Sequence, residues 1–237
     1  SYSTVHPVPS KSLMHNKFCI FNNKTVLTGT WNPTLRGTYV NDNAILLIRS
    51  PVIAGLYAKE YANLRSRTSL VPSSSFSNHP RNGYHISLSN TSVDLCFSPS
   101  QDCESLLIDS LHTANESIDF LTFSFTSDAV GFALASKSKK VSVTGVLEAT
   151  GLSKYSEFKK LKDAGAKVYK DANPAFMHQK TFIIDDQTLI IGSYNPTKNA
   201  RERNDENMLI IQDKGLSTLA KYDFDRIFSQ AVLKSVE

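Results

Sequence analysis

Two stretches of this chain repeat one another, and each contains a histidine, a lysine, a hydroxyl residue and an asparagine at matching positions. Residues 177–197 read MHQKTFIIDDQTLIIGSYNPT, and residues 14–34 read MHNKFCIFNNKTVLTGTWNPT. The offset is 163 residues throughout, from Met14 and Met177 onward, and no gap is needed. Each stretch holds two β-rich runs around a polar turn, which predicts a hairpin. Two copies of one polar constellation indicate a single site at a pseudo-twofold interface between two similar lobes.

The repeat extends beyond the two hairpins. An acidic residue follows each of them, Asp42 in the first copy and Glu206 in the second. Each copy then continues with an apolar run typical of a strand and a segment with helical periodicity. These segments are residues 44–48 and 52–64 in the first copy, and 207–211 and 216–228 in the second. Each lobe is therefore expected to end in a hairpin, a strand and a closing helix.

The region before the second hairpin alternates strand and helix signals. Strands are predicted at 93–97, 118–123, 141–147 and 167–169. Helices are predicted at 104–114, at 128–136 and from residue 153 to Gly165. This alternation predicts an α/β fold made of mixed β-sheets flanked by helices.

The first copy has no counterpart of residues 93–167; before its motif, only Val5 aligns with Val168. We therefore expect the first lobe to be N-terminally truncated and the chain to be a fragment, because an incomplete sheet leaves strand edges and an apolar face uncovered. The expected organisation is a partial first lobe at 1–65, a linker rich in Ser, Asn, Pro and Arg at 66–92, and a second lobe at 93–237.

Composition narrows the class of protein. The 237 residues are 41% hydrophobic and 20% charged, with a net charge of +4, which suits a polyanionic substrate without requiring one. No apolar run is long enough to span a bilayer, and the first residues lack the pattern of a secretory signal. The compartment is not indicated. Cys19, Cys96 and Cys103 lack metal-ligand spacing, and we expect them to be buried or unused thiols.

The repeated polar residues are of the types that bind a phosphate. In an extended strand, His15 and Lys17 point to one face, and so do His178 and Lys180. When each hairpin folds back, it brings a hydroxyl and an amide beside them; these are Thr30 and Asn32 in the first copy, and Ser193 and Asn195 in the second. Two such sets that face one another can enclose a tetrahedral anion with positive charge and neutral donors.

Two histidines allow a displacement in two steps. One imidazole attacks phosphorus, and the other protonates the leaving oxygen and then activates the incoming water or alcohol. We expect Asp42 and Glu206 to bond the far ring nitrogen of a histidine, which fixes the tautomer and raises the basicity of the ring. This scheme needs neither a metal nor a cofactor, and no cluster of His, Cys and carboxylate residues indicates a metal site.

The pattern His-x-Lys-x(4)-Asp followed by Gly-Ser/Thr-x-Asn, present twice, resembles the phospholipase D superfamily of double "HKD" enzymes. The resemblance covers residues 4–65 and 93–230. It implies a metal-independent phosphodiesterase that works through a covalent phosphohistidine, with His15 as the nucleophile and His178 as the acid. The motif acid is Asp185 in the second copy but Asn22 in the first. In the family this acid supports the motif, so Asn22 is expected to keep its hydrogen bonds without the charge.

Other residues near the motifs allow more than one interpretation. Trp31 and Tyr194 share one position of the repeat, and either stack on a substrate or pack at the lobe interface. Phe176 and Met177 either line the substrate channel or pack in the core. Glu148 follows a predicted strand, where α/β sites often lie, but we expect an ordinary surface glutamate.

The substrate is the open question, because nucleases, phospholipases and phosphatidyl transferases share this machinery. The stretches at 97–99 and 123–126 look similar to nuclease-like members of the family, and no lipid-anchoring helix is evident. The first hypothesis is therefore an endonuclease that prefers single-stranded nucleic acid. The alternatives are a phosphodiesterase or transferase acting on a lipid head group, and a non-catalytic nucleic-acid-binding module. Two motifs in one chain favour a monomer.

Overall fold

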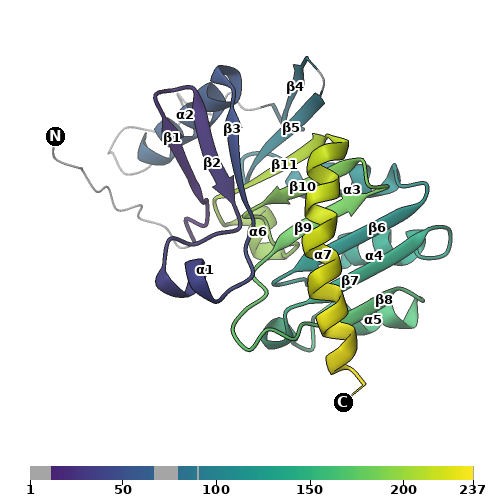
Figure 1. Ribbon diagram of the computed structural model, residues 1–237. Coiled ribbons are helices and arrows are strands. Elements are labelled where there is room, and N and C mark those ends of the chain that lie inside the picture. The colour runs from purple at the N-terminus through teal and green to yellow at the C-terminus, as the bar shows by residue number, and fades with distance from the viewer. Residues whose placement is uncertain (1–11, 67–79, 90, 237) are drawn as a thin grey trace.

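An eight-stranded mixed sheet forms the larger part of the structure, a computed structural model that describes residues 12–66, 80–89 and 91–236 (Figure 1). Its strand order is β4-β5-β11-β10-β9-β6-β7-β8. Strand β7 is parallel to both of its neighbours, β6 and β8, and all other neighbouring pairs are antiparallel. The strands are β4 (Tyr84–Leu88), β5 (Thr91–Ser98), β6 (Ser117–Thr122), β7 (Ser142–Leu147), β8 (Lys167–Lys170), β9 (Lys180–Ile184), β10 (Thr188–Gly192) and β11 (Glu206–Gln212).

Helices cover both faces of this sheet, which confirms the predicted α/β fold. Figure 1 shows the long helix α7 (Lys214–Lys234, yellow) crossing one face, with three helices on the other. Those three are α3 (Cys103–His112), α4 (Asp128–Lys137) and α5 (Phe158–Asp163). The side chains of Asp102, Ser127 and Asp213 accept a hydrogen bond from the first turns of α3, α4 and α7, as expected of N-caps.

A second, three-stranded antiparallel sheet is built from the first copy of the repeat. It consists of β1 (Phe18–Phe21), β2 (Thr25–Gly29) and β3 (Ile45–Arg49), with the short helix α1 (Leu35–Tyr39) between β2 and β3. Helix α2 (Pro51–Ser66) follows β3 and lies between the two sheets, because Ile53 and Tyr57 pack against Val26 of β2 and against Phe97 and Leu209 of the large sheet.

The other face of the small sheet carries exposed apolar side chains, Phe21, Ile45 and Leu47. The residues 163 positions later are Ile184, Met208 and Ile210, which are buried in the core beneath α3 and α4. The two sheets therefore differ in what covers this face.

Each motif is followed by the same local structure. The turns of both hairpins place Asn22 and Asp185 in the left-handed region, with φ of 51° and 53°, which asparagine and aspartate tolerate better than most residues. Thr34 and Thr197 then cap α1 and α6 (Lys198–Glu202) through their hydroxyl groups. The predicted hairpins, strands and closing helices all form, and α7 is longer than expected.

Two expectations are wrong. The region predicted as a connector contains β4, which pairs with β5 from Tyr84 opposite Leu95 to Leu88 opposite Thr91, while residues 67–79 lie outside the described part. Cys96 and Cys103 are not thiols but a buried disulfide that ties β5 to the start of α3. Cys19 is a free, exposed cysteine. The alignment of Val5 with Val168 also falls outside the described residues.

Candidate active site

Each motif histidine is anchored to the segment that precedes the last strand of the other copy. The backbone N–H of His15 donates to the carbonyl of Asp205 at 3.0 Å, and that of His178 donates to the carbonyl of Asp42 at 2.9 Å. Isolated β-bridges join Met14 to Asp205 and Asp42 to Met177 at the same places. The fold thus brings the two motifs together crosswise.

The His15 ring is bonded to a buried carboxylate. Its Nδ1 lies 2.7 Å from Oε2 of Glu206, which is fully buried. The same carboxylate accepts hydrogen bonds from Ser193 Oγ at 2.6 Å and from Asn204 Nδ2 at 3.2 Å. A carboxylate at Nδ1 keeps the proton on that nitrogen, which leaves a lone pair on Nε2.

The His178 ring has neutral partners instead. Its Nδ1 lies 3.0 Å from the carbonyl oxygen of Thr30 and 3.1 Å from Oδ1 of Asn43. The Asn43 amide is held in turn by the Thr30 hydroxyl and by the carbonyl of Gly37. Burial, together with the positive charges of Lys180 and Lys17, lowers the pKa of His178 to about 3. Both rings therefore present Nε2 to the site, but their electrostatic surroundings differ.

The expectation that Asp42 bonds a histidine ring is wrong. Its Oδ1 accepts from Arg226 and its Oδ2 from Asn173, each at 2.7 Å. Asn43, not Asp42, lies 163 residues before Glu206 and occupies the matching position. Asp42 lies 163 residues before Asp205, so the expected match of Asp42 to Glu206 is one residue out of register.

Two lysine ammonium groups lie beside the histidines, that of Lys180 on a buried residue and that of Lys17 on a partly exposed one. Lys17 Nζ donates to the carbonyl of His15 at 2.7 Å, and Lys180 Nζ to that of His178 at 2.8 Å. Burial lowers the pKa of Lys17 to about 8 against the opposing charge of Glu206. Burial and the charge of Lys17 hold the pKa of Lys180 well below its usual value. In the described part of the chain neither ammonium forms an ion pair, so an anion bound here would relieve an uncompensated charge.

The predicted substrate-binding residues have two different roles. The hydroxyls of Thr30 and Ser193 bond Asn43 and Glu206, so they orient the partners of the histidines. Asn195 accepts from the backbone N–H of Ser124 at 3.2 Å, which ties its loop to the end of β6. Asn32 lines a cavity of about 450 Å³ that opens beside His15.

The motif acids lie at the far turns of the hairpins. The Asp185 carboxylate accepts three backbone N–H groups, those of Asn115, Glu116 and Ser117, at 2.8 Å each. These bonds lower the pKa of Asp185 even though burial opposes the shift. Asn22 is exposed in the equivalent turn. Asp185 thus fastens the hairpin to the sheet, and neither Asn22 nor Asp185 is among the hydrogen-bond partners of the two histidine rings.

The structure shows where the residues near the motifs that allowed two interpretations lie. Tyr194 is buried in the core, whereas Trp31 is partly exposed and lines the cavity beside His15. Met177 is buried, and Phe176 is partly exposed. Glu148 is buried rather than a surface residue, because its carboxylate accepts from the backbone N–H of Met177 at 2.8 Å and positions the strand that carries His178.

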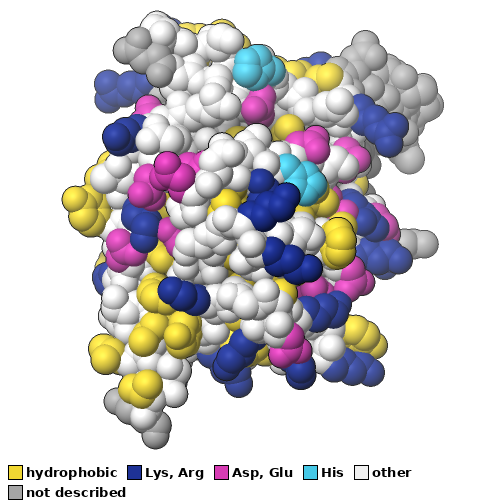
Figure 2. All heavy atoms as spheres, turned by 90° about the vertical axis from the view of Figure 1, so that its right-hand side faces the viewer, with side chains coloured by type: hydrophobic (Ala, Val, Ile, Leu, Met, Phe, Trp, Pro, Cys, Tyr) yellow, Lys and Arg dark blue, Asp and Glu magenta, His cyan; other side chains and the backbone are white. Residues whose placement is uncertain are grey.

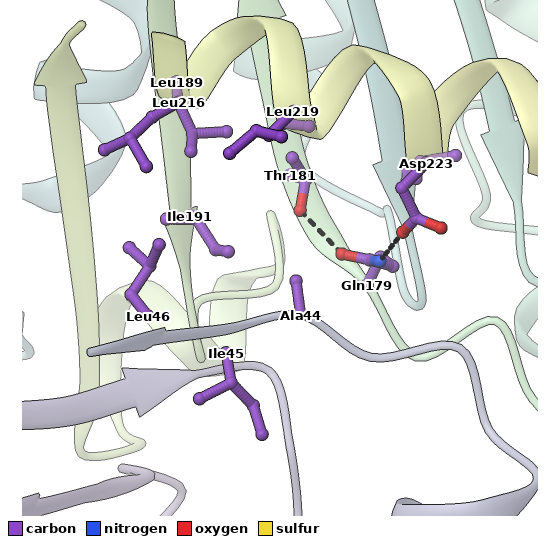
Figure 3. Close-up of a pocket in the computed structure, with 12 residues that line it drawn as sticks. Ala44, Ile45, Leu46, Gln179, Thr181, Leu189, Ile191, Leu216, Leu219 and Asp223 are labelled. Atoms are coloured by element: carbon purple, nitrogen blue, oxygen red, sulfur yellow. Dashed lines mark hydrogen bonds between the residues drawn. The ribbon is translucent and has the colours of Figure 1, made fainter.

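A second cavity, of about 270 Å³, lies between β3 and α7 (Figure 3). It is lined mostly by apolar side chains. At its edge, Gln179 accepts from Thr181 and donates to Asp223, as the dashed lines in Figure 3 show. Gln179 alternates with His178 and Lys180 along the chain, so this cavity lies on the face opposite the side chains of His178 and Lys180.

Neither a metal site nor a membrane-spanning helix is evident in the described residues. They contain no group of three His, Cys, Asp or Glu side chains arranged to hold a metal ion. None of the helices built from them combines the length and apolar character that crossing a bilayer requires.

Comparison with known proteins agrees with this geometry. The family model described as "Cardiolipin synthase, PLD-like domain" matches residues 2–65 and 107–228. This chain belongs to the phospholipase D superfamily. It is 34% identical over 155 residues to a "Phospholipase D" of Rickettsia prowazekii, an alignment that covers 63% of this chain and 76% of that one. The resemblance seen in the sequence is thereby confirmed, and the chain is an enzyme of the phosphodiesterase type.

Solved structures of the superfamily share the fold. Nuc from Salmonella typhimurium, a phospholipase D family member, superposes with a TM-score of 0.57 and 26% identity over 60% of this chain and 96% of Nuc. A phosphatidylserine synthase from Haemophilus influenzae superposes with a TM-score of 0.66 over 93% of this chain and 62% of that one. At 14% identity, the second likeness concerns the fold alone.

Proposed function

We propose that this phosphodiesterase cleaves single-stranded nucleic acid through a covalent phosphohistidine on His15, without a metal ion. The observation that carries the chemistry is the unequal pairing of the two rings. Glu206 gives His15 a carboxylate that stabilises positive charge on the ring as Nε2 bonds to phosphorus. His178 faces only neutral acceptors at Nδ1, which suits a ring that gains and loses a proton at Nε2.

The first step forms the bond from His15 Nε2 to phosphorus and breaks the bond from phosphorus to the leaving oxygen. That oxygen takes a proton from His178 Nε2. In the empty site burial and, after it, the lysine charges disfavour this proton, and the negative charge of the bound phosphodiester favours it.

In the second step, neutral His178 accepts a proton from water. The water oxygen attacks phosphorus, and the bond from phosphorus to nitrogen breaks and frees His15. Lys17 and Lys180 hold the phosphoryl oxygens in both steps.

Surface charge supports a polyanionic substrate. Between residues 137 and 170 the sequence has nine lysines and three acidic residues. Figure 2, a view of the side on which α4, α5 and β8 lie, shows Lys and Arg side chains spread over the lower part of that face among fewer Asp and Glu. Such a surface attracts a phosphate backbone and makes binding sensitive to salt.

The test is cleavage of an end-labelled single-stranded oligonucleotide in EDTA. We expect the wild-type protein to cleave it and His178→Ala and His15→Ala to be inactive. When the reaction is stopped without acid, the covalent intermediate should be detected as substrate phosphate bound to the wild-type protein. No such phosphate should be bound to His15→Ala. Cleavage that needs an added divalent metal, or cleavage by His178→Ala, would contradict the mechanism.

A lipid phosphodiesterase is the second candidate. The matched relative is named a phospholipase D and the family model a cardiolipin synthase, which favours this candidate. Release of head groups from vesicles of phosphatidylglycerol and cardiolipin, assayed beside the oligonucleotide, separates the two. A kcat/KM that is higher for the vesicles would favour lipid.

A further inference from the structure

Two phenylalanine rings form a partly exposed wall beside His178. Phe123 follows the end of β6, and its ring centroid lies 4.8 Å from that of His178. Phe176 lies two residues before His178, and its ring centroid is 5.6 Å from that of Phe123 in an edge-on arrangement. Neither ring belongs to the buried apolar clusters of the described residues. The wall therefore runs outward from the catalytic ring toward solvent.

A cation lies against each ring. Lys180 Nζ is 4.8 Å from the centroid of Phe123, and the Arg36 guanidinium is 5.3 Å from that of Phe176. Arg36 is exposed on α1, and within the described residues it forms no ion pair. A guanidinium stacked on an aromatic face keeps its N–H groups at the edge, where they can bind a phosphate.

We propose that Phe176 and Arg36 form a subsite for the nucleotide on the leaving-group side of the scissile phosphate. The Phe176 ring stacks on the base, and Arg36 contacts the next phosphate along the strand. The side follows from His178, which protonates the leaving oxygen, so the inference rests on the proposed function.

The physical basis is the usual recognition of single strands. Stacking of bases on aromatic rings tolerates any sequence, and nearby cations follow the backbone. A base within a duplex is already stacked and cannot reach the Phe176 ring without unpairing. The subsite thus accounts for a preference for single-stranded substrates.

The test uses an oligonucleotide with a single phosphodiester, all other linkages being methylphosphonates. The phosphate that Arg36 would contact is supplied as a terminal phosphate monoester on the leaving-side nucleotide. A matched oligonucleotide carries an abasic residue on the leaving side. For wild-type protein, we expect loss of the base to lower kcat/KM roughly ten- to a hundredfold. Phe176→Ala should show the same loss with the normal strand and no further loss with the abasic strand.

Further variants distinguish stacking from packing. Phe176→Trp should retain activity, whereas Phe176→Leu, which keeps apolar bulk without a flat ring, should behave like Phe176→Ala. Arg36→Gln should reduce the slope of log kcat/KM against log salt by about one. Phe132→Ala, which removes an exposed ring on α4, is the matched control and should match wild type. Thermal melts establish that each variant is folded.

The outcomes separate two kinds of failure. If wild-type protein cleaves the normal strand but Phe176→Leu is equally active, or if the abasic residue costs Phe176→Ala as much as wild type, the subsite is wrong and the proposed function stands. If wild-type protein cleaves no oligonucleotide in EDTA, the proposed function fails, and the subsite fails with it.

Discussion

The carboxylate of Glu206 lies 2.7 Å from Nδ1 of His15, a residue 191 positions earlier in the chain. The acid of the second copy thus serves the histidine of the first. The reciprocal position is Asn43, whose amide oxygen lies 3.1 Å from Nδ1 of His178. Because one ring faces a carboxylate and the other an amide, the two histidines are chemically distinct before any substrate binds.

Replacing Glu206 with glutamine should lower kcat on the order of 10²- to 10⁴-fold, because the amide removes the charge and can impose the wrong tautomer on His15. The measurement is single-turnover cleavage with saturating protein. Asp42→Asn is the matched control, since its carboxylate faces Arg226 and Asn173. The kcat of Asp42→Asn should stay within a few fold of that of wild type. Equal losses in the two variants would contradict the crosswise pairing.

Asn43→Asp should raise the pKa of His178, because a carboxylate beside Nδ1 stabilises the protonated ring. The rise should be visible in an NMR titration of the His178 ring and should displace the limb of the pH–kcat profile that His178 governs. Asn23→Asp adds the same charge in the β1–β2 turn, away from the site, and should leave the titration unchanged. An unshifted His178 in Asn43→Asp would show that the amide does not set its protonation.

Local structure was readable from the sequence, because it depends on neighbours along the chain. The alternation of apolar residues in both copies located the hairpins, and the helical periodicity at 104–114 located α3. The strand β4 carried the same signal, since Tyr84, Ile86 and Leu88 alternate with polar residues. The polar composition around it concealed that pattern.

The pairing of side chains across the site was not readable, because it depends on how the two sheets dock. The bond from Glu206 to His15 crosses between the copies, and the spacing of residues within a copy does not show which histidine an acid contacts. Asn43 lies at the repeat position that matches Glu206, but the neighbouring acid, Asp42, was expected to fill that role. The buried Glu148 could be recognised only once β7 was seen to end beside Met177.

The disulfide between Cys96 and Cys103 predicts a specific pattern of thiol labelling. In denaturant without reductant, only Cys19 should react with an alkylating reagent, and all three cysteines should react after reduction. Replacing both bonded cysteines with alanine should lower the free energy of unfolding by about 2 kcal/mol, because the short loop is no longer closed in the unfolded chain. Labelling of three thiols without reductant would contradict the bond.

His178 should make the protein less stable in acid. Its pKa is about 3 in the folded protein, lowered mainly by burial, and about 6.5 when unfolded. The unfolded chain therefore binds more protons between these values, so this contribution to stability is present above pH 6.5 and is lost as the pH falls toward 3. Urea unfolding at pH 7 and pH 5 should show wild type losing about 1–2 kcal/mol more than His178→Asn. Equal losses would mean that the ring is already charged in the folded state.

The buried ammonium of Lys180 should destabilise the empty protein and be stabilised by an anion. Lys180 is almost fully buried and has no ion-pair partner among the described residues, and burial depresses its pKa. In buffer without phosphate, Lys180→Met should therefore have a free energy of unfolding about 1–2 kcal/mol larger than wild type and a higher melting temperature, while it loses activity. Inorganic phosphate should raise the melting temperature of wild type. It should do the same for Lys170→Met, the control in which an exposed lysine is replaced. For Lys180→Met, phosphate should have no effect beyond that of salt in general. If Lys180→Met is less stable than wild type, or if phosphate raises its melting temperature as much as that of wild type, the Lys180 ammonium does not form an anion-binding site.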